Sequence, residues 1–195
     1  MTSYISLSGL LIAAAITPGP NNLIVLESAA QGGIMAAARP IIGVLTGSLA
    51  LLIVTWFGLE AVSGSVPRFE LLIATLGATY LMWLGATLAF ETRPAGDAAA
   101  GLPAGVANVA LFQFANPKSW VLVATSAAAV SATGSIFVLA GLMSVISLLC
   151  LASWAGVGTA LSKLLRRARN RILFNRAMGT LLMISAFGVL FDGLR

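Results

Sequence analysis

Histidine is missing from the sequence, and cysteine occurs once, as Cys150. Without histidine the chain cannot build an imidazole metal site or a Cys–His nucleophile, and one cysteine cannot form a disulfide within the chain. Charged residues are also scarce, at 9% of 195 residues, whereas a soluble domain carries about 25%. Hydrophobic residues make up 59%. This composition predicts an integral membrane protein with no metal and no other cofactor.

Six apolar stretches have about the 20 residues that a membrane span requires. They are Tyr4–Glu27, Pro40–Glu60, Phe69–Phe90, Ala104–Val130, Ser135–Leu161 and Ile172–Phe191. A linker rich in Pro, Gly and Ala, at about residues 93–103, separates the third stretch from the fourth. We therefore expect one transmembrane domain over residues 1–195. Its first half covers about residues 1–92 and its second half about residues 104–195, with three spans in each.

The N-terminal apolar run, Leu7–Ala15, resembles the core of a secretory signal peptide. A signal peptide also has a basic segment before that core, but no Lys or Arg precedes Arg39. We therefore expect this run to be retained as part of the first span.

The basic residues are concentrated in one loop. Six of the eleven lie between Lys163 and Arg176. The cluster lies between two apolar spans, so we favour a membrane-anchoring use over a nucleic-acid partner. By the positive-inside rule, loop 162–171 is cytoplasmic and both termini lie outside.

A faint internal repeat relates the two halves. A shift of 97 residues lays "GPNNLIVLESA", Gly19–Ala29, over "NPKSWVLVATS", Asn116–Ser126, and aligns Pro20 with Pro117. Three spans per half turn the second half over relative to the first, which is the arrangement of inverted-repeat transporters. The predicted fold is all-α, with six transmembrane helices forming two inverted three-helix repeats. Helices one and four are broken.

The first break is a run of six residues in the first span: Thr17, Pro18, Gly19, Pro20, Asn21 and Asn22. Proline lacks an N–H donor and leaves carbonyls one turn upstream unpaired. In a membrane, such a break persists only against protein or a polar cavity. The helix that starts after it presents free N–H groups and a positive dipole end, which favour a carboxylate.

The second break, "QFANPKSW", repeats this logic in the fourth span. Asn116 is a strong helix N-cap and Pro117 fits the first turn. Lys118 places a charge near the middle of the membrane, where an ionisable residue suggests a functional site. Trp120 follows two residues later and is a further candidate for the lining. We expect the residues of both breaks to line one substrate site; the alternative is that each proline only kinks a helix.

These motifs resemble those of the LysE/RhtB amino-acid exporters, whose "PGP" and "NPK" motifs correspond to Pro18–Pro20 and Asn116–Lys118. The likeness extends to Gly77–Phe90 and Met178–Leu190, and "TPGPNN" is most similar to the cysteine/O-acetylserine exporter branch. The resemblance implies six spans in a bacterial cytoplasmic (inner) membrane. It also implies export of amino acids driven by protons.

Glu27 departs from the family pattern, so the resemblance assigns it no role. It lies one to two turns beyond Asn22 and is the best-placed carboxylate for proton coupling. Burial disfavours the charged form of a carboxyl group, which suits a proton carrier. The alternative is that Glu27 meets water at the cytoplasmic end of its span.

The leading prediction of function is a secondary active exporter of small neutral amino acids, such as cysteine, O-acetylserine, threonine or homoserine. The core of the second span, Gly43–Gly58, has no acidic residue to neutralise a basic substrate, and Glu60 lies only at its end. The alternatives are a passive channel for small polar solutes and an exporter of basic amino acids. An enzyme is not expected, since general acid–base chemistry has few candidate groups here. Gly43 and Gly47 form a G-x-x-x-G motif, which favours packing within the fold over a homodimer interface.

Overall fold

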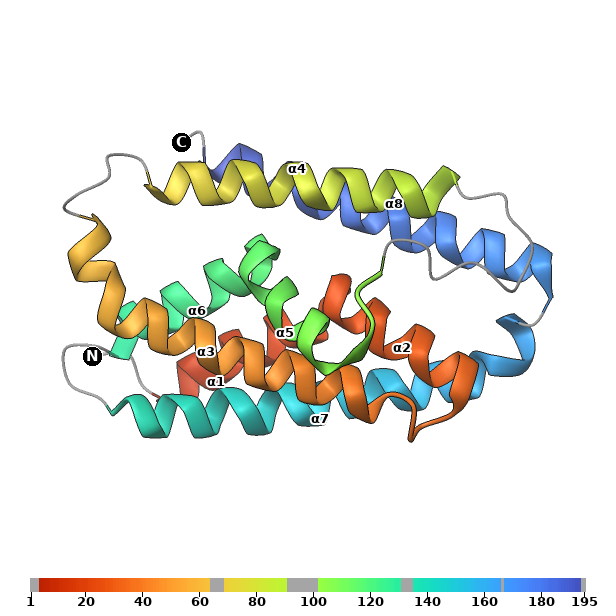
Figure 1. The fold of residues 1–195 in the computed structure, drawn as a ribbon, viewed down its shortest axis with the longest axis horizontal. Helices are drawn as coiled ribbons and strands as arrows, with labels where there is room; N and C mark the ends of the chain where they lie inside the picture. Colours follow the sequence, from red (N-terminus) through yellow and green to blue (C-terminus); the bar gives the residue numbers. More distant parts are fainter. Residues whose placement is uncertain (1–3, 64–68, 91–101, 131–134, 166, 194–195) are drawn as a thin grey trace.

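The structure, a computed structural model, describes residues 4–63, 69–90, 102–130, 135–165 and 167–193. Each regular element in these ranges is a helix (Figure 1). The helices are α1 (Tyr4–Ile16), α2 (Pro20–Gly32), α3 (Ala38–Ser63), α4 (Phe69–Phe90), α5 (Gly105–Ala115), α6 (Pro117–Val130), α7 (Ile136–Leu165) and α8 (Ala168–Gly193). The all-helical prediction is confirmed. Most of the predicted linker, residues 91–101, lies outside the described ranges.

The helices follow the six apolar stretches. The first and fourth stretches are each divided in two: α1 and α2 meet at a bend of 52°, and the single residue Asn116 separates α5 from α6. By length and composition, the described residues contain two helices able to cross a membrane, within α3 and α7, or three if α1 and α2 form one span. The arrangement of six spans therefore stays a prediction.

The packing pairs helices across the two halves. α4 packs along α8, α2 along α7, and α3 along α5, while α1 and α6 have looser contacts with α7 and α3. In the predicted repeat, α1, α2, α3 and α4 correspond to α5, α6, α7 and α8. The contact of α3 with α5 then corresponds to that of α7 with α1, and the contact of α2 with α7 to that of α6 with α3. This correspondence is expected for a repeat.

Glycine permits the closest of these approaches. A Cβ added at Gly47 would meet the backbone of Ala110 in α5, and one added at Gly158 would overlap the carbonyl oxygen of Leu26 in α2. Gly43 lies against Val106 and Val109 of the same helix α5. The G-x-x-x-G motif therefore packs within the fold, as the sequence indicated.

Two apolar clusters fill the bundle on either side of the two breaks. The α1–α6 cluster contains Leu7, Leu11, Leu51, Leu52, Val123, Ala127, Val130, Leu139 and Met143. The α2–α5 cluster contains Ile24, Val25, Ala29, Ala37, Val44, Val109, Phe112, Leu151 and Ala155. The first draws on α1, α3, α6 and α7, and the second on α2, α3, α5 and α7. Exchange of the repeats converts one set of helices into the other.

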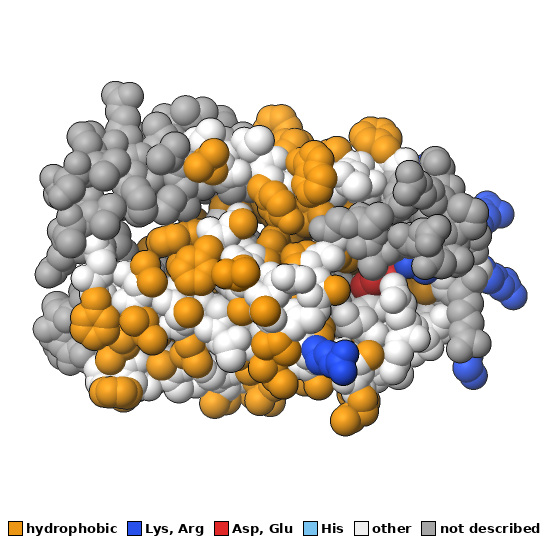
Figure 2. Space-filling view, in the orientation of Figure 1, with side chains coloured by type: hydrophobic (Ala, Val, Ile, Leu, Met, Phe, Trp, Pro, Cys, Tyr) orange, Lys and Arg blue, Asp and Glu red, His pale blue; other side chains and the backbone are white. Residues whose placement is uncertain are grey.

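The surface suits a lipid environment. Large apolar side chains are exposed on most helices, among them Phe57, Phe90, Phe137 and Phe187. Orange side chains cover much of the described face in Figure 2, and Lys and Arg gather towards the end where α7 meets α8. The basic side chains of the described residues are thus concentrated at one end of the bundle.

Candidate functional site

The first break leaves the start of α2 open. Gly19 is the N-cap residue in extended conformation, with no side-chain cap, and Pro20 follows it. The first bond of the new helix runs from Leu23 N–H to Gly19 O at 3.0 Å. Since the first N–H groups of a helix have no partner within it, those of Asn21 and Asn22 are available to a ligand.

The carbonyl groups at the end of α1 are satisfied from both halves of the protein. Asn22 Nδ2 donates to Ala15 O at 3.0 Å and to Thr17 O at 2.9 Å. Lys118 Nζ, from the second break, donates to the same Thr17 O at 2.6 Å. A cation at the C-terminal end of a helix is favoured by the helix dipole. The lysine therefore joins the two breaks while its positive charge stays beside the open start of α2.

At the second break, the side chain and the carbonyl group of Asn116 accept hydrogen bonds from the first turn of α6. Asn116 Oδ1 accepts the Lys118 N–H at 3.1 Å, and the Asn116 carbonyl accepts from Ser119 N–H at 3.0 Å and Trp120 N–H at 3.2 Å. Asn116 thus caps α6, as its residue type predicted. The start of α6 is therefore occupied by its own cap, and the start of α2 is the more open anion-binding end.

A buried amide network connects the breaks. Asn21 Nδ2 donates to Gln113 Oε1 at 2.9 Å, and Gln113 Nε2 donates back to Asn21 Oδ1 at 3.0 Å. Ser119 Oγ donates to Gln113 Oε1 at 2.8 Å, and Asn116 Nδ2 approaches Asn21 Oδ1 at 3.5 Å. Gln113 is fully buried. The network fixes α2 against α5 and α6 at mid-bundle.

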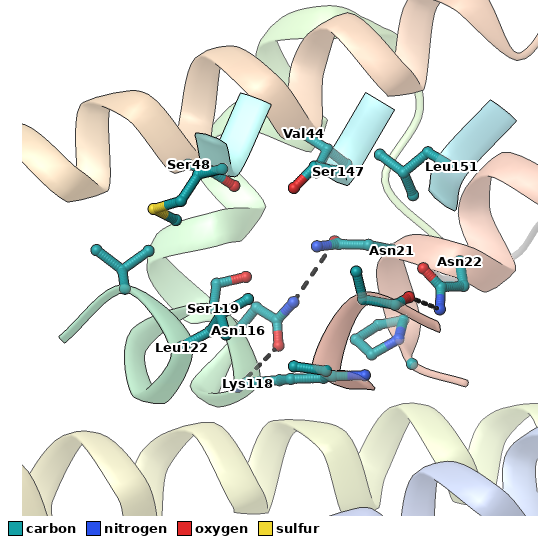
Figure 3. A pocket seen from close by; sticks show the side chains of 16 residues that line it. Asn21, Asn22, Val44, Ser48, Asn116, Lys118, Ser119, Leu122, Ser147 and Leu151 are labelled. Carbon is teal, nitrogen blue, oxygen red and sulfur yellow. Dashed lines mark hydrogen bonds between the residues drawn. The ribbon is translucent and has the colours of Figure 1, made fainter. Parts of the chain in front are cut away.

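A cavity of about 60 Å³ lies where the breaks meet, enough for several water-sized groups. Its lining comprises Ala14, Ala15, Gly19, Pro20, Asn21, Asn22, Val44, Ser48, Asn116, Lys118, Ser119, Leu122, Val123, Met143, Ser147 and Leu151. Figure 3 shows the Ser48 and Ser147 hydroxyl groups on the side of the cavity opposite Lys118. The cavity thus has a cation and free N–H groups on one side and hydroxyl groups on the other.

The lining repeats between the halves. With the shift of 97 residues, Gly19 corresponds to Asn116, Asn21 to Lys118 and Asn22 to Ser119. With a shift of 99 residues, α3 corresponds to α7, and Ser48 falls on Ser147. Both halves therefore supply the cavity from equivalent positions.

The predicted site residues divide into two groups. Six line the cavity: Gly19, Pro20, Asn21, Asn22, Asn116 and Lys118. Four do not: Thr17, Pro18, Pro117 and Trp120. Thr17 Oγ1 bonds to Ala13 O at 2.7 Å, and Trp120 Nε1 bonds to Phe114 O at 2.8 Å. The part that these four play in transport stays a prediction.

The structure adds four polar residues to the site, Gln113, Ser119, Ser48 and Ser147. Gln113 could have been identified from the sequence, because it is a single polar residue among apolar residues, three positions before Asn116. The three serines could not have been identified from the sequence, since small hydroxyl residues are common in transmembrane helices as packing residues.

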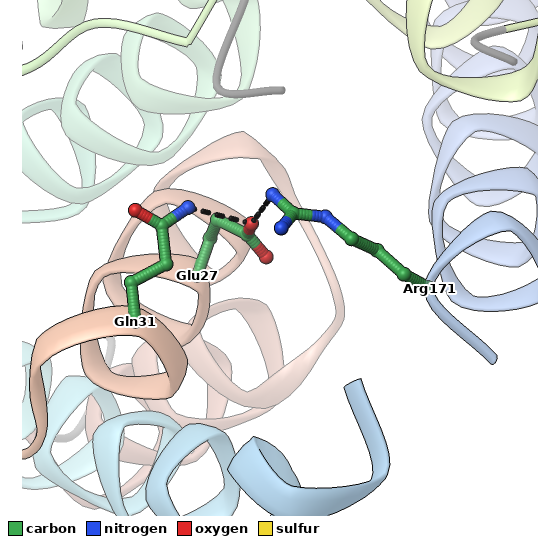
Figure 4. A network of polar contacts seen from close by, with 3 residues as sticks. All are labelled: Glu27, Gln31 and Arg171. Carbon is green, nitrogen blue, oxygen red and sulfur yellow. Dashed lines mark hydrogen bonds and ion pairs between the residues drawn. The ribbon is translucent and has the colours of Figure 1, made fainter. Parts of the chain in front are cut away.

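Glu27 lies away from the cavity in an ion pair. Its Oε1 accepts from Arg171 at 2.6 Å and from Gln31 Nε2 at 2.9 Å (Figure 4). The side chains of Glu27 and Arg171 are 10% and 14% exposed. The bond joins α2 to the start of α8, beside the basic loop. Glu27 is thus nearly buried and paired rather than solvated, and its role in proton coupling stays a prediction. Nothing in the sequence indicated Arg171 as its partner.

A search against known families matches residues 12–193 to the family described as LysE type translocator. This match covers nearly the whole chain and agrees with the likeness carried by the two break motifs.

Several proteins with similar sequences are named as efflux proteins. A leucine efflux protein of Enterobacter sp. (strain 638) is 34% identical over 70 residues, which are 36% of this chain and 33% of that protein. A cysteine/O-acetylserine efflux protein of Klebsiella pneumoniae is 29% identical over 104 residues, 53% of each chain. A leucine efflux protein of Salmonella choleraesuis is 27% identical over 109 residues, 53% of this chain and 51% of that protein. The matches thus span about a third to a half of these relatives. No solved structure matches the chain significantly.

Proposed function

Because the chain belongs to the LysE type translocator family, we propose that it is a secondary active exporter of small neutral amino acids. The observation that carries the proposal is the polar cavity at the meeting point of two broken helices, enclosed by apolar clusters at both ends. The similarity to named leucine and cysteine/O-acetylserine efflux proteins supports amino acids as the substrate class.

The polarity of the cavity suits a zwitterion. We infer that the substrate carboxylate binds the N–H groups of Asn21 and Asn22, next to the Lys118 ammonium group. The substrate ammonium group would then lie towards the hydroxyl groups of Ser48 and Ser147 and the Asn22 amide oxygen. Each charged end meets groups of suitable sign or dipole, which a buried zwitterion requires.

Transport would proceed by alternating access. In this proposal the α1–α6 cluster and the α2–α5 cluster separate in turn, and the inverted repeats exchange roles. The close packing of α2 on α7 at Gly158, and of α5 on α3 at Gly47, is consistent with a state that is shut more firmly at the α2–α5 end.

The proposed topology has six spans in the bacterial inner membrane. The N-terminus and C-terminus lie outside, and loop 162–171 lies in the cytoplasm. The α2–α5 end is then the cytoplasmic end. A homodimer, where one forms, would use a face other than Gly43 and Gly47, since α5 covers these residues.

Protons are the proposed energy source, with Glu27 as their carrier. Protonation of Glu27 would remove the negative charge that holds Arg171 and free α2 from α8. Coupling at this position would link proton uptake to opening of the cytoplasmic end.

An efflux assay tests the proposal. Cells that produce the protein are loaded with labelled threonine, cysteine, leucine and lysine, and efflux is compared with that of cells producing the Lys118→Met variant. We expect faster efflux of the small neutral amino acids, driven uphill and lost on addition of an uncoupler. Efflux that only equalises concentrations would instead support a passive channel, and preferential efflux of lysine would support a basic amino-acid exporter.

A further inference from the structure

Two buried hydroxyl groups lie outside the cavity without a hydrogen-bond partner among the described residues. They are Thr55 Oγ1 on α3 and Ser126 Oγ on α6, and the two residues are 2% and 0% exposed. A serine or threonine in a helix usually donates to the carbonyl four residues earlier. Thr46, Thr79, Thr87, Ser153, Thr159 and Thr180 do so in this structure. Thr55 and Ser126 do not, so both keep an unused donor in an apolar environment, which costs free energy.

Both residues continue the polar faces that line the cavity. Thr55 follows the cavity residue Ser48 by two helical turns on α3, and Ser126 follows the cavity residue Ser119 by two turns on α6. Residues seven apart lie on one face of a helix, about 10 Å apart along its axis. Both helices lead from the cavity into the α1–α6 cluster.

Thr55 and Ser126 lie on the cluster-forming faces of their helices. Leu51 and Leu52, four and three residues before Thr55, belong to that cluster, as do Val123 and Val130 on either side of Ser126. In the alternating-access mechanism proposed above, separation of this cluster would therefore place the two hydroxyl groups along the passage that opens.

The predicted internal repeat places apolar residues at the positions equivalent to these hydroxyl groups. The residue equivalent to Ser126 is Ala29, and the residue equivalent to Thr55 is Trp154. Ala29 belongs to the α2–α5 cluster, and Trp154 packs against it. The same structural positions are thus filled by apolar side chains at the other end of the molecule.

We propose that Thr55 and Ser126 form a second polar binding station for the zwitterionic substrate, between the cavity and the α1–α6 end of the protein. This proposal rests on the exporter function proposed above. Once the α1–α6 cluster opens, each hydroxyl group hydrogen-bonds to the carboxylate or ammonium group of the passing amino acid. This second station lowers the free-energy barrier for the substrate to leave the cavity, and it takes no part in substrate binding within the cavity.

The test uses the full-length protein in proteoliposomes with labelled threonine, cysteine and homoserine. Variants are Thr55→Val, Ser126→Ala and their combination, with Thr159→Val as matched control because its hydroxyl bonds to Ala155 O at 3.0 Å. We expect the double variant to lose about fivefold in maximal rate, the effect of roughly one hydrogen bond, with unchanged KM. Its thermal stability should be equal or higher, since an unpaired buried hydroxyl is removed. Thr55→Ser should retain the wild-type rate.

Two results would overturn the proposal. Wild-type rates in the double variant would show that the hydroxyl groups are idle. A loss of thermal stability together with rate would show that they have a structural partner. Failure of the exporter function itself appears separately, as absence of transport in the wild-type protein before any variant is compared.

Discussion

The side-chain amides of Asn21 and Gln113 bond to each other twice, at 2.9 and 3.0 Å, and so tie the half-helix after the first break to the half-helix before the second. Removal of either partner takes two hydrogen bonds from the other, and each such bond is worth about 0.5–1.5 kcal/mol. In a double-mutant cycle of Asn21→Ala and Gln113→Ala, we expect a coupling energy of about 1–2 kcal/mol in the free energy of unfolding.

The matched control for this cycle is Gln113→Ala combined with Thr180→Ala. Thr180 is exposed and bonds to Arg176 O within its own helix. These two changes should add without coupling. An equally additive result for Asn21 and Gln113 would contradict the mutual amide bond.

Lys118 provides the second prediction. In Lys118→Met the ammonium group is lost but the apolar stem remains, and Thr17 O still accepts from Asn22 at 2.9 Å. The protein should therefore insert normally while efflux of a neutral amino acid falls by about tenfold or more, as expected for an ionisable residue within a membrane site. The same change at the exposed Lys163 is the control and should leave efflux unaltered.

Gly19 lies against the same lysine. A Cβ added there would lie 3.1 Å from Lys118 Nζ and 3.2 Å from Lys118 Cδ, so a flexible side chain has to move by a few tenths of an ångström. We expect Gly19→Ala to reduce efflux severalfold and Gly19→Leu to abolish it, with normal amounts of protein in the membrane. Gly141 has nothing within 4 Å of its added Cβ, so Gly141→Leu should transport normally. Full activity of Gly19→Leu would exclude this break from the site.

The two breaks show which parts of the structure can be predicted from the sequence. Pro18, Pro20 and Pro117 predict interrupted helices because proline removes backbone bonds locally, and the structure has helix ends at these places. Asn116 as an N-cap is likewise a local property. The pairing of Asn21 with Gln113 could not be predicted, because residues 92 positions apart meet only through tertiary packing.

The Glu27–Arg171 ion pair illustrates the same limit. Each residue alone suggests a solvated charge at a span end, and only the packing of α2 beside the start of α8 makes them partners. The role of Ser48 and Ser147 could not be predicted for another reason. In the sequence alone, a serine that lines a cavity in a membrane helix cannot be distinguished from a serine that packs against another helix.

The fourth prediction separates two roles of that ion pair. Glu27→Gln removes the negative charge that faces Arg171, and loss of one partner of a buried pair is destabilising. The double variant Glu27→Gln/Arg171→Gln should recover much of the thermal stability that either single variant loses. If Glu27 carries the proton, the double variant remains unable to drive export uphill, although it exchanges amino acids downhill. Restored uphill export in the double variant would rule out Glu27 as the coupling residue.

The last prediction concerns the charge of the substrate. The described residues that line the cavity supply the Lys118 ammonium group, the open N-terminus of α2 and several hydroxyl and amide groups, but no carboxylate. A lysine substrate would bring a second cation into this environment, and an unpaired buried charge is very costly. Among the described residues, the nearest acidic candidate by sequence is Glu27, and its Oε1 already accepts from Arg171 and Gln31.

A neutral amino acid avoids this cost, because its single ammonium group can be met by Ser48, Ser147 and the Asn22 oxygen. We therefore expect threonine and cysteine to leave loaded proteoliposomes at least about tenfold faster than lysine at equal internal concentration, which corresponds to about 1.4 kcal/mol of discrimination. Placing a carboxylate in the lining, by Ser48→Asp, should narrow or reverse that ratio, whereas Ser48→Asn should not. Lysine leaving fastest from the wild-type protein, in a manner abolished by Glu27→Gln, would show that Glu27 reaches the substrate and that the charge argument is wrong.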